Sequence, residues 1–326
     1  MIYIINDMTD PYFNLAAEEY VLKNFEEDCF MLWQNSPSII VGKNQNTLSE
    51  INYEYVKRNN IPVVRRLSGG GAVFHDLGNL NFTFVAASED DIYKSFRKFT
   101  SPIIEVLQSL GVPAEFSGRN DLTINGRKFS GNAQYHFKNK VLHHGTILFS
   151  SNVSAISSAL NVKSSKFKDK AVKSVSSRIT NVNEHLSSPL TIKQFINHLM
   201  AFIMSKYGKA SIYKYDEEDI YEIIKLKQNK YDTWDWNYGS SPKYNFSNEK
   251  SFAGGNMEFS LYVERGIIKD IKIYGDFFGK LDIEHIENAL IGVKHSEDAI
   301  RQALASFELM DYFYNITQDD IIEGLL

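Results

Sequence analysis

The chain has little cysteine: Cys29 is the single thiol among its 326 residues. One thiol excludes a disulfide within the chain and any metal cluster that the chain could build from thiolates alone. Cys29 follows three acidic residues and opens the apolar stretch CFMLW, with no glycine, histidine or asparagine beside it. This setting favours a buried strand residue over a nucleophile, and such sparing use of cysteine is typical of a reduced, cytoplasmic compartment.

Long hydrophobic runs and an excess of positive charge are also missing. The N-terminal MIYIINDMTD has neither a basic nor a continuous apolar region, so it predicts a first strand rather than a signal peptide. The most apolar helical stretch, FINHLMAFIM, is interrupted by Asn197 and His198 and is too short to span a bilayer. The net charge of −5 argues against general nucleic-acid binding. We therefore expect a cytoplasmic protein without a membrane or nucleic-acid partner.

What remains is the composition of an ordinary globular protein, with 43% hydrophobic and 23% charged residues. Consecutive strand patterns with helices at both ends of the run predict an α+β fold, with mixed or antiparallel sheets flanked by helices, and not a doubly wound sheet. The turn-rich segment YDTWDWNYGSSPKYNFSNEKS predicts a domain boundary. We place a catalytic domain at 1–248 and a small α+β domain at 249–326.

Four local elements are predicted from the residues that typically begin or end a helix or form a tight turn. Asn14 is a candidate cap for a helix that ends near Lys23. The amphipathic pattern over 91–110 predicts a long helix that Gly111 ends. Asn-Gly at 125–126 and Arg-Gly at 265–266 each predict the turn of a hairpin.

The stretch RRLSGGGAVFHDLGN, residues 65–79, combines three consecutive glycines with two arginines. Glycines lose much backbone entropy when the chain folds. Three in a row are therefore expected only where the backbone must approach another group closely or adopt an unusual dihedral angle. Backbone N–H groups at glycines can converge on an anion, and flanking arginines bind carboxylate or phosphate. The stretch lacks both the Gly-Lys-Ser/Thr ending of a Walker loop and the spacing of a dinucleotide fingerprint. The stretch therefore predicts a backbone loop that binds an anion. The alternative is a glycine-rich structural hairpin whose arginines lie on the surface.

A second motif, SGRNDLTINGRKFSGNAQ, covers residues 117–134. Asp121 precedes the Asn-Gly turn and Lys128 follows it, so the two side chains can face each other across a hairpin. A carboxylate beside a lysine suggests a magnesium ligand and a cation for an oxyanion. The alternative is an exposed cross-strand salt bridge. The small residues of SGNAQ leave room for a ligand and favour the binding site.

Two further segments carry candidate binding residues. In HHGT, residues 143–146, adjacent strand positions point to opposite faces, so the two histidines cannot share one metal ion. We predict that His144, beside Gly145, faces a ligand. Residues 163–178 hold six basic residues and one acidic residue. This segment is a solvated loop, a lid over a negatively charged adenylate or a docking surface for an acidic partner.

The motifs RRLSGGGAVFHDLGN, GRNDLTINGRKFSGNA and HHGTIL, in this order, resemble lipoate–protein ligases, which belong to a larger group with biotin ligases and lipoyl or octanoyl transferases. The resemblance runs through residues 1 to about 246 and extends into the C-terminal unit as an accessory domain. It implies that lipoate and Mg-ATP form lipoyl-adenylate and pyrophosphate, and that the lipoyl group then passes to a lysine of an apo-lipoyl domain. The implied acceptors are 2-oxoacid dehydrogenase E2 subunits, glycine cleavage H protein or both, and the implied enzyme is a monomer.

The resemblance also implies roles for individual residues. Lys128 bridges the lipoate carboxylate and the α-phosphate, Asp121 holds Mg²⁺, and Arg66 contacts the nucleotide phosphates or the pyrophosphate. The adenine side is lined by Gly71, Ala72, Val73 and Phe74. The remaining pocket residues are Ser68, Gly70, His75, Asn79, Ala133 and His144, together with Trp33 in the apolar tunnel for the dithiolane chain.

Two alternatives from other classes stay open. A lipoyl or octanoyl transferase of the same fold moves the acyl group without ATP, either through a thioester on Cys29 or without a cysteine. A non-catalytic module that senses lipoate needs none of the catalytic chemistry, and so has no reason to keep Asp121, Lys128 and Arg66 together.

Overall fold

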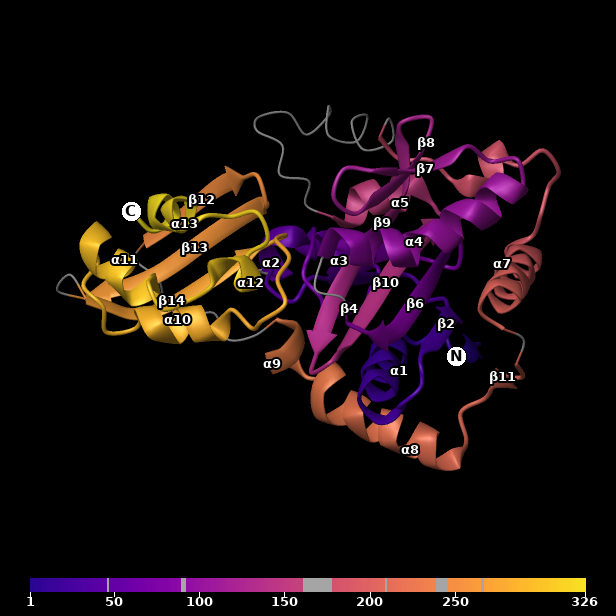
Figure 1. The fold of residues 1–326 in the computed structure, drawn as a ribbon, viewed down its shortest axis with the longest axis horizontal. Helices are drawn as coiled ribbons and strands as arrows, with labels where there is room; N and C mark the ends of the chain where they lie inside the picture. The colour runs from indigo at the N-terminus through magenta and orange to yellow at the C-terminus, as the bar shows by residue number, and fades with distance from the viewer. Residues whose placement is uncertain (46, 89–91, 161–177, 209, 239–245, 265–266) are drawn as a thin grey trace. The chain divides into compact units, whose positions relative to one another are not determined.

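The computed structural model describes residues 1–45, 47–88, 92–160, 178–208, 210–238, 246–264 and 267–326. The chain forms two compact units. Unit 1 comprises Met1–Ile40, Leu48–Arg65 and Ala72–Asn237, and unit 2 comprises Val41–Thr47, Arg66–Gly71 and Tyr238–Leu326. Each unit combines a sheet with helices (Figure 1), which confirms the predicted α+β class.

Unit 1 is built on an eight-stranded sheet in the order β11-β1-β2-β6-β10-β9-β8-β7. Its strands are β1 (Ile2–Asn6), β2 (Cys29–Trp33), β6 (Asn79–Ala87), β7 (Ala114–Ser117), β8 (Asp121–Ile124), β9 (Arg127–Phe137), β10 (Lys140–Leu148) and β11 (Ile212–Tyr213). β1 runs parallel to β2 and β11, whereas the other pairs are antiparallel. The sheet is therefore mixed, as predicted.

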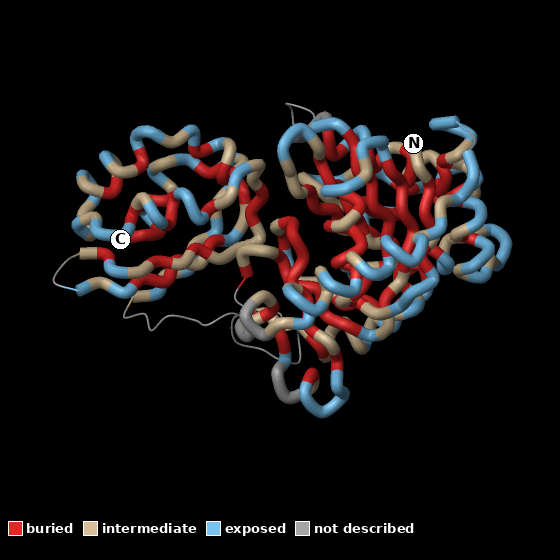
Figure 2. The backbone as a smooth tube through the Cα atoms, turned by 90° about the horizontal axis from the view of Figure 1, so that it is seen from below, coloured by how far each residue is buried: buried red, intermediate tan, exposed pale blue. Residues whose placement is uncertain are grey.

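The two faces of this sheet differ. One face, the core face, packs against α4 (Ile92–Ser109) and α7 (Ile192–Tyr207) through an apolar core that includes Phe82 and Leu32. Burying a side chain of this size stabilises the fold by about 2 kcal/mol. The opposite face, the α1 face, packs against α1 (Pro11–Asn24). Figure 2 shows the buried strands as a continuous layer in unit 1.

The start of α1 corrects the sequence prediction. Asp10 is the cap, because its side chain accepts from the Tyr12 N–H at 3.0 Å and Pro11 occupies the first helical position. Asn14 is instead buried within the helix, where its Nδ2 donates to the Met8 carbonyl at 2.8 Å and to Asn35 Oδ1 at 2.8 Å. Proline fits the first turn without losing a hydrogen bond, and it fixes the helix start ahead of Asn14.

Two other local predictions are confirmed in unit 1. α4 covers the predicted long helix, and Gly111 follows it with a φ of 81°. Asn125 and Gly126 have φ of 51° and 75°, which a two-residue turn between twisted antiparallel strands requires.

A small sheet in the order β4-β3-β5 completes the strands of this region, with β3 (Ser38–Val41), β4 (Val63–Arg65) and β5 (Val73–His75). The shorter helical elements are α2 (Thr47–Glu50), α3 (Tyr53–Arg58), α5 (Val153–Ala159), η1 (Val182–His185), α8 (Glu217–Leu226), η2 (Lys227–Tyr231) and α9 (Trp234–Asn237).

Unit 2 contains an antiparallel sheet in the order β12-β13-β14, and it has an apolar core of its own. Its strands are β12 (Phe246–Phe252), β13 (Gly255–Glu264) and β14 (Ile267–Gly275), and its helices are α10 (Glu284–Leu290), α11 (Glu297–Leu304), α12 (Leu309–Tyr312) and α13 (Gln318–Leu325). β12 continues across residue 248. β13 pairs with β14 on either side of the predicted Arg265-Gly266 turn, whose residues lie outside the described part of the chain. Among the described helices, none has both the length and the apolarity needed to cross a membrane.

Candidate active site

The residues predicted for the site are distributed over both units. Unit 2 holds Arg66, Ser68, Gly70 and Gly71. Unit 1 holds the remaining predicted residues, which are Trp33, Ala72, Val73, Phe74, His75, Asn79, Asp121, Lys128, Ala133 and His144.

A row of side-chain positions crosses the α1 face from β8 to β2. Asp121 is opposite Gly131, Thr146 is opposite Asn81, and Asn81 is opposite Trp33. The Gly131 N–H donates to Thr146 Oγ1 at 3.2 Å and so connects the two halves of the row. Neighbouring strands lie about 4.8 Å apart, so the row is about 19 Å long. The two ends of the row are Asp121, which the second motif predicts, and Trp33, which the resemblance implies.

A register shift in the β8–β9 hairpin directs Lys128 to this row. The shift lies between Leu122 and Thr123, after which Thr123 is opposite Lys128. Lys128 Nζ lies 2.7 Å from Asp121 Oδ1, and a Cβ added at Gly131 would lie 3.1 Å from the same Nζ. The ammonium group therefore lies over Gly131 on the α1 face, and the predicted approach of Asp121 and Lys128 is confirmed. Such bulges commonly redirect a side chain beside a functional site.

The Asp121–Lys128 ion pair is open to solvent. The side chains of Lys128 and Asp121 are 40% and 37% exposed. An ion pair this exposed contributes at most about 1 kcal/mol to stability, so both charges are accessible for a ligand at little cost to the fold.

Asp121 was predicted to bind Mg²⁺. In the described part of the chain, no three side chains of the His, Cys, Asp and Glu types converge in a way that could hold a metal ion. Mg²⁺ is commonly held by one or two carboxylates together with phosphate oxygens of the substrate. Asp121 can therefore contribute one carboxylate to a Mg²⁺ site that nucleotide phosphates would complete.

Beside the first row, a buried network connects two predicted residues through a helix residue that the sequence did not reveal. His144 and Thr83 are opposite each other on β10 and β6. The Glu18 carboxylate, on α1, accepts from Thr83 Oγ1 at 2.5 Å and lies 3.0 Å from His144 Nδ1. Trp33 Nε1 in turn donates to Thr83 Oγ1 at 3.0 Å. Glu18 thus fixes both the predicted tunnel residue Trp33 and the predicted ligand-facing His144.

The two adjacent histidines point to opposite faces, as strand alternation predicts. His143 lies among aromatic rings on the core face, with its ring centroid 6.0 Å from that of Phe82 and 5.3 Å from that of Phe99. Complete burial lowers the pKa of His143 well below its ordinary value, so this imidazole is neutral. A metal ion shared by His143 and His144 is excluded by this arrangement.

His75 and Asn79 lie close to Trp33. The ring centroids of Trp33 and His75 are 6.2 Å apart, and His75 Nδ1 lies 3.0 Å from Asn35 Nδ2. Asn79 Nδ2 donates to Asn81 Oδ1 at 2.9 Å. The structure therefore brings Trp33, His75, Asn79 and His144 to one region of unit 1, around residues of β2 and β6.

Sequence reasoning missed several polar residues here, among them Glu18, Asn81, Thr83 and Thr146. Asn79, Asn81 and Thr83 alternate with apolar residues in NLNFTF, and this period of two would have placed all three on one face. The sequence gives no such signal for Glu18. It stands beside a second glutamate, Glu19, and a pair of glutamates in a helix does not by itself indicate that both are buried, as the structure shows them to be.

In unit 2, the glycine stretch is organised by Arg66. Its guanidinium donates to the carbonyls of Gly69 at 2.6 Å and Gly71 at 2.9 Å, and to Ser68 Oγ at 3.0 Å. A Cβ added at Gly69 would lie 2.5 Å from the Phe277 carbonyl oxygen, and Gly70 has a φ of 91°. Apart from its two chain neighbours, no described residue has an atom within 4 Å of a Cβ added at Gly71. The first two glycines therefore serve packing and backbone geometry in unit 2, whereas the third does not.

Because the surroundings of Gly69 and Gly71 differ, replacing each by alanine is expected to affect the stability of the protein differently. We expect Gly69→Ala to destabilise unit 2 by about 2 kcal/mol, because the added methyl group meets backbone that cannot yield cheaply. Gly71→Ala adds the same methyl group in open space and is expected to leave stability unchanged. Differential scanning calorimetry of the full chain measures both. Equal melting temperatures for the two variants would contradict this account of the glycines.

The neighbouring Arg65 has a different function, in unit 1. Its Nε donates to the Trp236 carbonyl at 2.9 Å and its Nη2 to the Asn237 carbonyl at 3.1 Å, while Trp236 Nε1 donates to the Arg65 carbonyl at 2.8 Å. Arg65 and Arg66 are 8% and 6% exposed. The alternative of a hairpin with surface arginines is therefore wrong.

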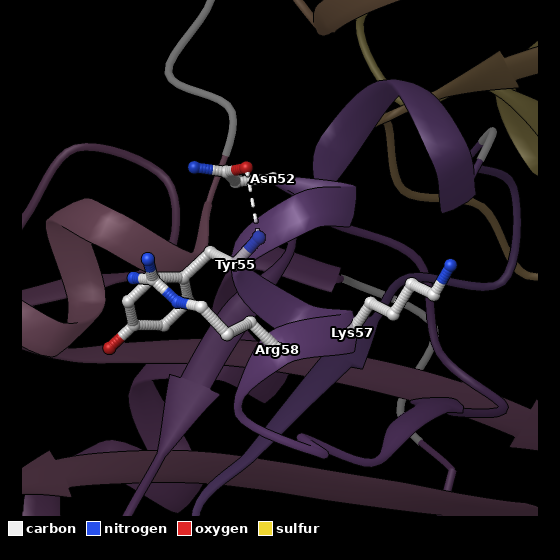
Figure 3. A pocket seen from close by; sticks show the side chains of 4 residues that line it. All are labelled: Asn52, Tyr55, Lys57 and Arg58. Carbon is white, nitrogen blue, oxygen red and sulfur yellow. Dashed lines mark hydrogen bonds between the residues drawn. The ribbon is translucent and has the colours of Figure 1, made fainter.

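Two other candidate features do not contribute to this arrangement. An open pocket of about 630 Å³ is lined by Asn52, Tyr55, Lys57 and Arg58 (Figure 3), and it contains none of the predicted residues. The basic segment 163–178 lies outside the described residues except for Arg178. The chain that follows is fixed beside Lys128, because the Thr180 N–H donates to the Lys128 carbonyl at 2.9 Å.

Cys29 lies on β2 and is fully buried. Burial, followed by the nearby Glu27 carboxylate, raises the pKa of its thiol to about 12. A thiol of this kind supplies almost no thiolate near neutral pH, so Cys29 is poorly suited to form an acyl-thioester.

Comparison with known families identifies the family to which the chain belongs. A family model described as the Lipoyl protein ligase A/B catalytic domain matches residues 10–203, which is more than half of the chain. A second model, the Bacterial lipoate protein ligase C-terminus, matches residues 241–325. The chain belongs to the lipoate–protein ligase family. It is accordingly a ligase, and the resemblance stated from the three motifs is confirmed.

Relatives of this lipoate–protein ligase family member match it over nearly its whole length. Lipoate-protein ligase LplJ of Bacillus subtilis (strain 168) is 45% identical, with 99% of each chain covered. Lipoate--protein ligase 1 of Staphylococcus aureus (strain Mu50 / ATCC 700699) is 46% identical, with 97% of each covered.

Solved structures in the same family show the same fold. The structure of P. falciparum LipL1 in complex with lipoate has a TM-score of 0.81 at 28% identity, covering 99% of this chain and 98% of that one. A lipoate-protein ligase A bound with ATP has a TM-score of 0.65 at 26% identity, covering 73% and 98%. A bipartite ligase studied with its E2 lipoyl domain, from Thermoplasma acidophilum, has a TM-score of 0.68 at 29% identity, covering 76% and 100%.

Proposed function

We propose that this ligase activates free lipoate with ATP and transfers the lipoyl group to a lysine of apo-lipoyl domains. The observation that carries the proposal is the row on the α1 face, which begins at the accessible Lys128–Asp121 pair and ends at Trp33. A fatty acid with one charged end suits such a row, because its carboxylate meets the cation while its chain extends toward the buried aromatic residue. The relatives bound to lipoate and to ATP support the same two substrates.

In the first step, a lipoate carboxylate oxygen attacks the α-phosphorus of ATP, and pyrophosphate leaves. No protein nucleophile is needed, so the work of the enzyme is positioning and charge neutralisation. Lys128 bridges the carboxylate and the α-phosphate, and its positive charge offsets the charge of these two anions. In unit 2, Arg66 contacts the nucleotide phosphates or the pyrophosphate, with Ser68 and Gly70 beside it. The adenine contacts come from Gly71, Ala72, Val73 and Phe74.

Asp121 is the residue that would hold Mg²⁺ together with the nucleotide phosphates. When bound there, Mg²⁺ supplies additional neutralisation of the phosphate charge. The chain's own contribution is to hold the carboxylate of Asp121 within reach of the same ligand as Lys128, which the 2.7 Å ion pair supports.

In the second step, the ε-amino group of the acceptor lysine attacks the acyl carbonyl carbon, the amide bond forms, and AMP leaves with the electron pair of the anhydride bond. The acceptors are lipoyl domains of 2-oxoacid dehydrogenase E2 subunits, glycine cleavage H protein or both. The relative studied with its E2 lipoyl domain supports this class of partner. On the same family resemblance, the enzyme acts as a cytoplasmic monomer, with residues 1–248 as its catalytic domain and 249–326 as an accessory domain.

Incubation with ATP, Mg²⁺, lipoate and an apo-lipoyl domain, followed by intact-mass measurement, tests the proposal. We expect the acceptor to gain the mass of one lipoyl group and ATP to give equimolar AMP and pyrophosphate. Lipoylation of the acceptor without ATP consumption would instead indicate a transferase. Binding of lipoate without pyrophosphate release would indicate a sensing module.

The Cys29→Ser variant distinguishes the ligase from a thioester-forming transferase. We expect it to retain at least half of the wild-type rate of lipoylation with free lipoate and ATP, because the buried thiol takes no part in either step. A serine hydroxyl can also donate to the Glu27 carbonyl, as the Cys29 thiol does at 3.3 Å. If the variant loses activity but keeps a normal circular-dichroism spectrum and melting temperature, the result would support the thioester mechanism.

A further inference from the structure

We propose that Asn81 determines substrate specificity by recognising the dithiolane ring of lipoate. Its side-chain Nδ2–H donates a hydrogen bond to a ring sulfur. This inference rests on the proposed function and adds a residue to it. Asn81 is 2% exposed, and its Nδ2 has no hydrogen-bond partner among the described residues. Buried amide groups are normally paired with protein or water, so a donor without a protein partner at this position is available to a ligand.

The Asn81 amide is hydrogen-bonded to a neighbour whose own Oδ1 has no partner among the described residues. Asn79, which is fully buried, donates from Nδ2 to Asn81 Oδ1 at 2.9 Å. With the oxygen engaged by Asn79, the donor of Asn81 is the part of the amide that remains for a ligand. Asn79 therefore acts as a positioning residue for Asn81.

The place of Asn81 in the row matches the length of lipoate. Lys128 Nζ lies over Gly131 on β9, and Asn81 lies two strands further along the sheet, on β6. Two strand intervals are about 10 Å. A carboxylate bound to Lys128 adds about 3 Å, and the extended methylene chain between the carboxylate and the ring adds about 6 Å. A carboxylate at Lys128 therefore brings the dithiolane ring level with Asn81, one strand before Trp33.

Sulfur is a weak hydrogen-bond acceptor, and a hydrocarbon chain accepts no hydrogen bond at all. Octanoate has the carboxylate and the chain length of lipoate but lacks the sulfurs, so with octanoate the buried donor stays unpaired. A site built around a donor disfavours an analogue that leaves the donor without an acceptor. The amide of Asn81 would therefore favour lipoate over octanoate.

The test compares lipoate with octanoate in pyrophosphate release, for wild type, Asn81→Leu and Asn81→Asp. Leucine has nearly the shape of asparagine and no donor, whereas aspartate keeps the oxygen that accepts from Asn79 and replaces only the donor. We expect the ratio of kcat/KM for lipoate to that for octanoate to fall about tenfold in both variants, through a higher KM for lipoate. Calorimetric titration of each acid in the absence of ATP should show the same shift in affinity.

Asn132→Leu is the matched control. Asn132 is also 2% exposed and also has one unpaired side-chain atom, Oδ1, but it faces the core side of the same sheet. This variant is expected to lose stability and to keep the wild-type lipoate to octanoate ratio. An unchanged ratio in both Asn81 variants, or an equal loss for both acids, would overturn the inference. Absence of pyrophosphate release by the wild type with either acid would contradict the proposed function instead, and the titrations would still test Asn81.

Discussion

Lys128→Ala is expected to lower the rate of lipoate-dependent ATP–pyrophosphate exchange by at least about 100-fold. Such a loss corresponds to roughly 2.7 kcal/mol of transition-state stabilisation, which is typical when a donor to a developing oxyanion is removed. Lys128 is the cation that the β8–β9 register shift directs to the α1 face, 2.7 Å from Asp121. Without it, the lipoate carboxylate and the α-phosphate must approach each other without the positive charge of Lys128.

Lys250→Ala is the control for this substitution. Lys250 forms a similarly exposed ion pair in unit 2, with Nζ 2.9 Å from Glu323 Oε1 and a side chain that is 38% exposed. Its removal should change neither the exchange rate nor the melting temperature by a measurable amount. Near-normal exchange by a folded Lys128→Ala enzyme would remove Lys128 from the mechanism.

Glu18→Ala is expected to destabilise unit 1 by about 3 kcal/mol. The Glu18 side chain is 3% exposed, and its carboxylate is the shared acceptor for Thr83 and His144. Truncation leaves these buried polar groups without their partner, and breaking a buried charged network in this way is strongly destabilising. Glu18→Gln keeps one acceptor oxygen and should have a smaller effect.

The loss at Glu18 can be measured on unit 1 alone. All three tryptophans of the chain, Trp33, Trp234 and Trp236, belong to unit 1, so tryptophan fluorescence during urea unfolding reports on that unit. Glu105→Ala is the matched control, since Glu105 is 43% exposed and pairs with Lys206 at 2.5 Å on the surface. Its expected effect is below about 1 kcal/mol. Equal urea midpoints for Glu18→Ala and Glu105→Ala would show that the buried network contributes nothing.

The sequence was informative where a local rule decides the structure. The Asn125-Gly126 turn, the α4 helix and the alternation of His143 and His144 were all predictable, because each depends on a few adjacent residues. The start of α1 was not, since two rules competed there and Pro11 after Asp10 prevailed over Asn14. The motifs also located the Asp121–Lys128 pair, because a two-residue turn limits how far apart its flanking strands can lie.

The features that the sequence did not predict depend on contacts between residues far apart in the chain. Nothing local to NLAAEE indicates that Glu18 joins His144, which lies 126 positions further along the chain. The register shift that turns Lys128 to the α1 face is likewise invisible in TINGRKF, because it depends on how β9 pairs with β8 after Thr123. The three glycines look equivalent in the sequence, yet their surroundings in unit 2 distinguish Gly69 from Gly71.

The discontinuous course of unit 2 sets an order for folding during synthesis. The loop that contains Gly69 packs against the Phe277 carbonyl, which is made some 200 residues later, or roughly 10 to 40 s at common translation rates. Arg65, one residue before this loop, contacts Trp236 and Asn237 in unit 1, which are made about 40 residues before Phe277. Arg65 and the glycine loop therefore gain their distant partners at different points of synthesis, and the packing of the loop on unit 2 waits for the chain up to Phe277.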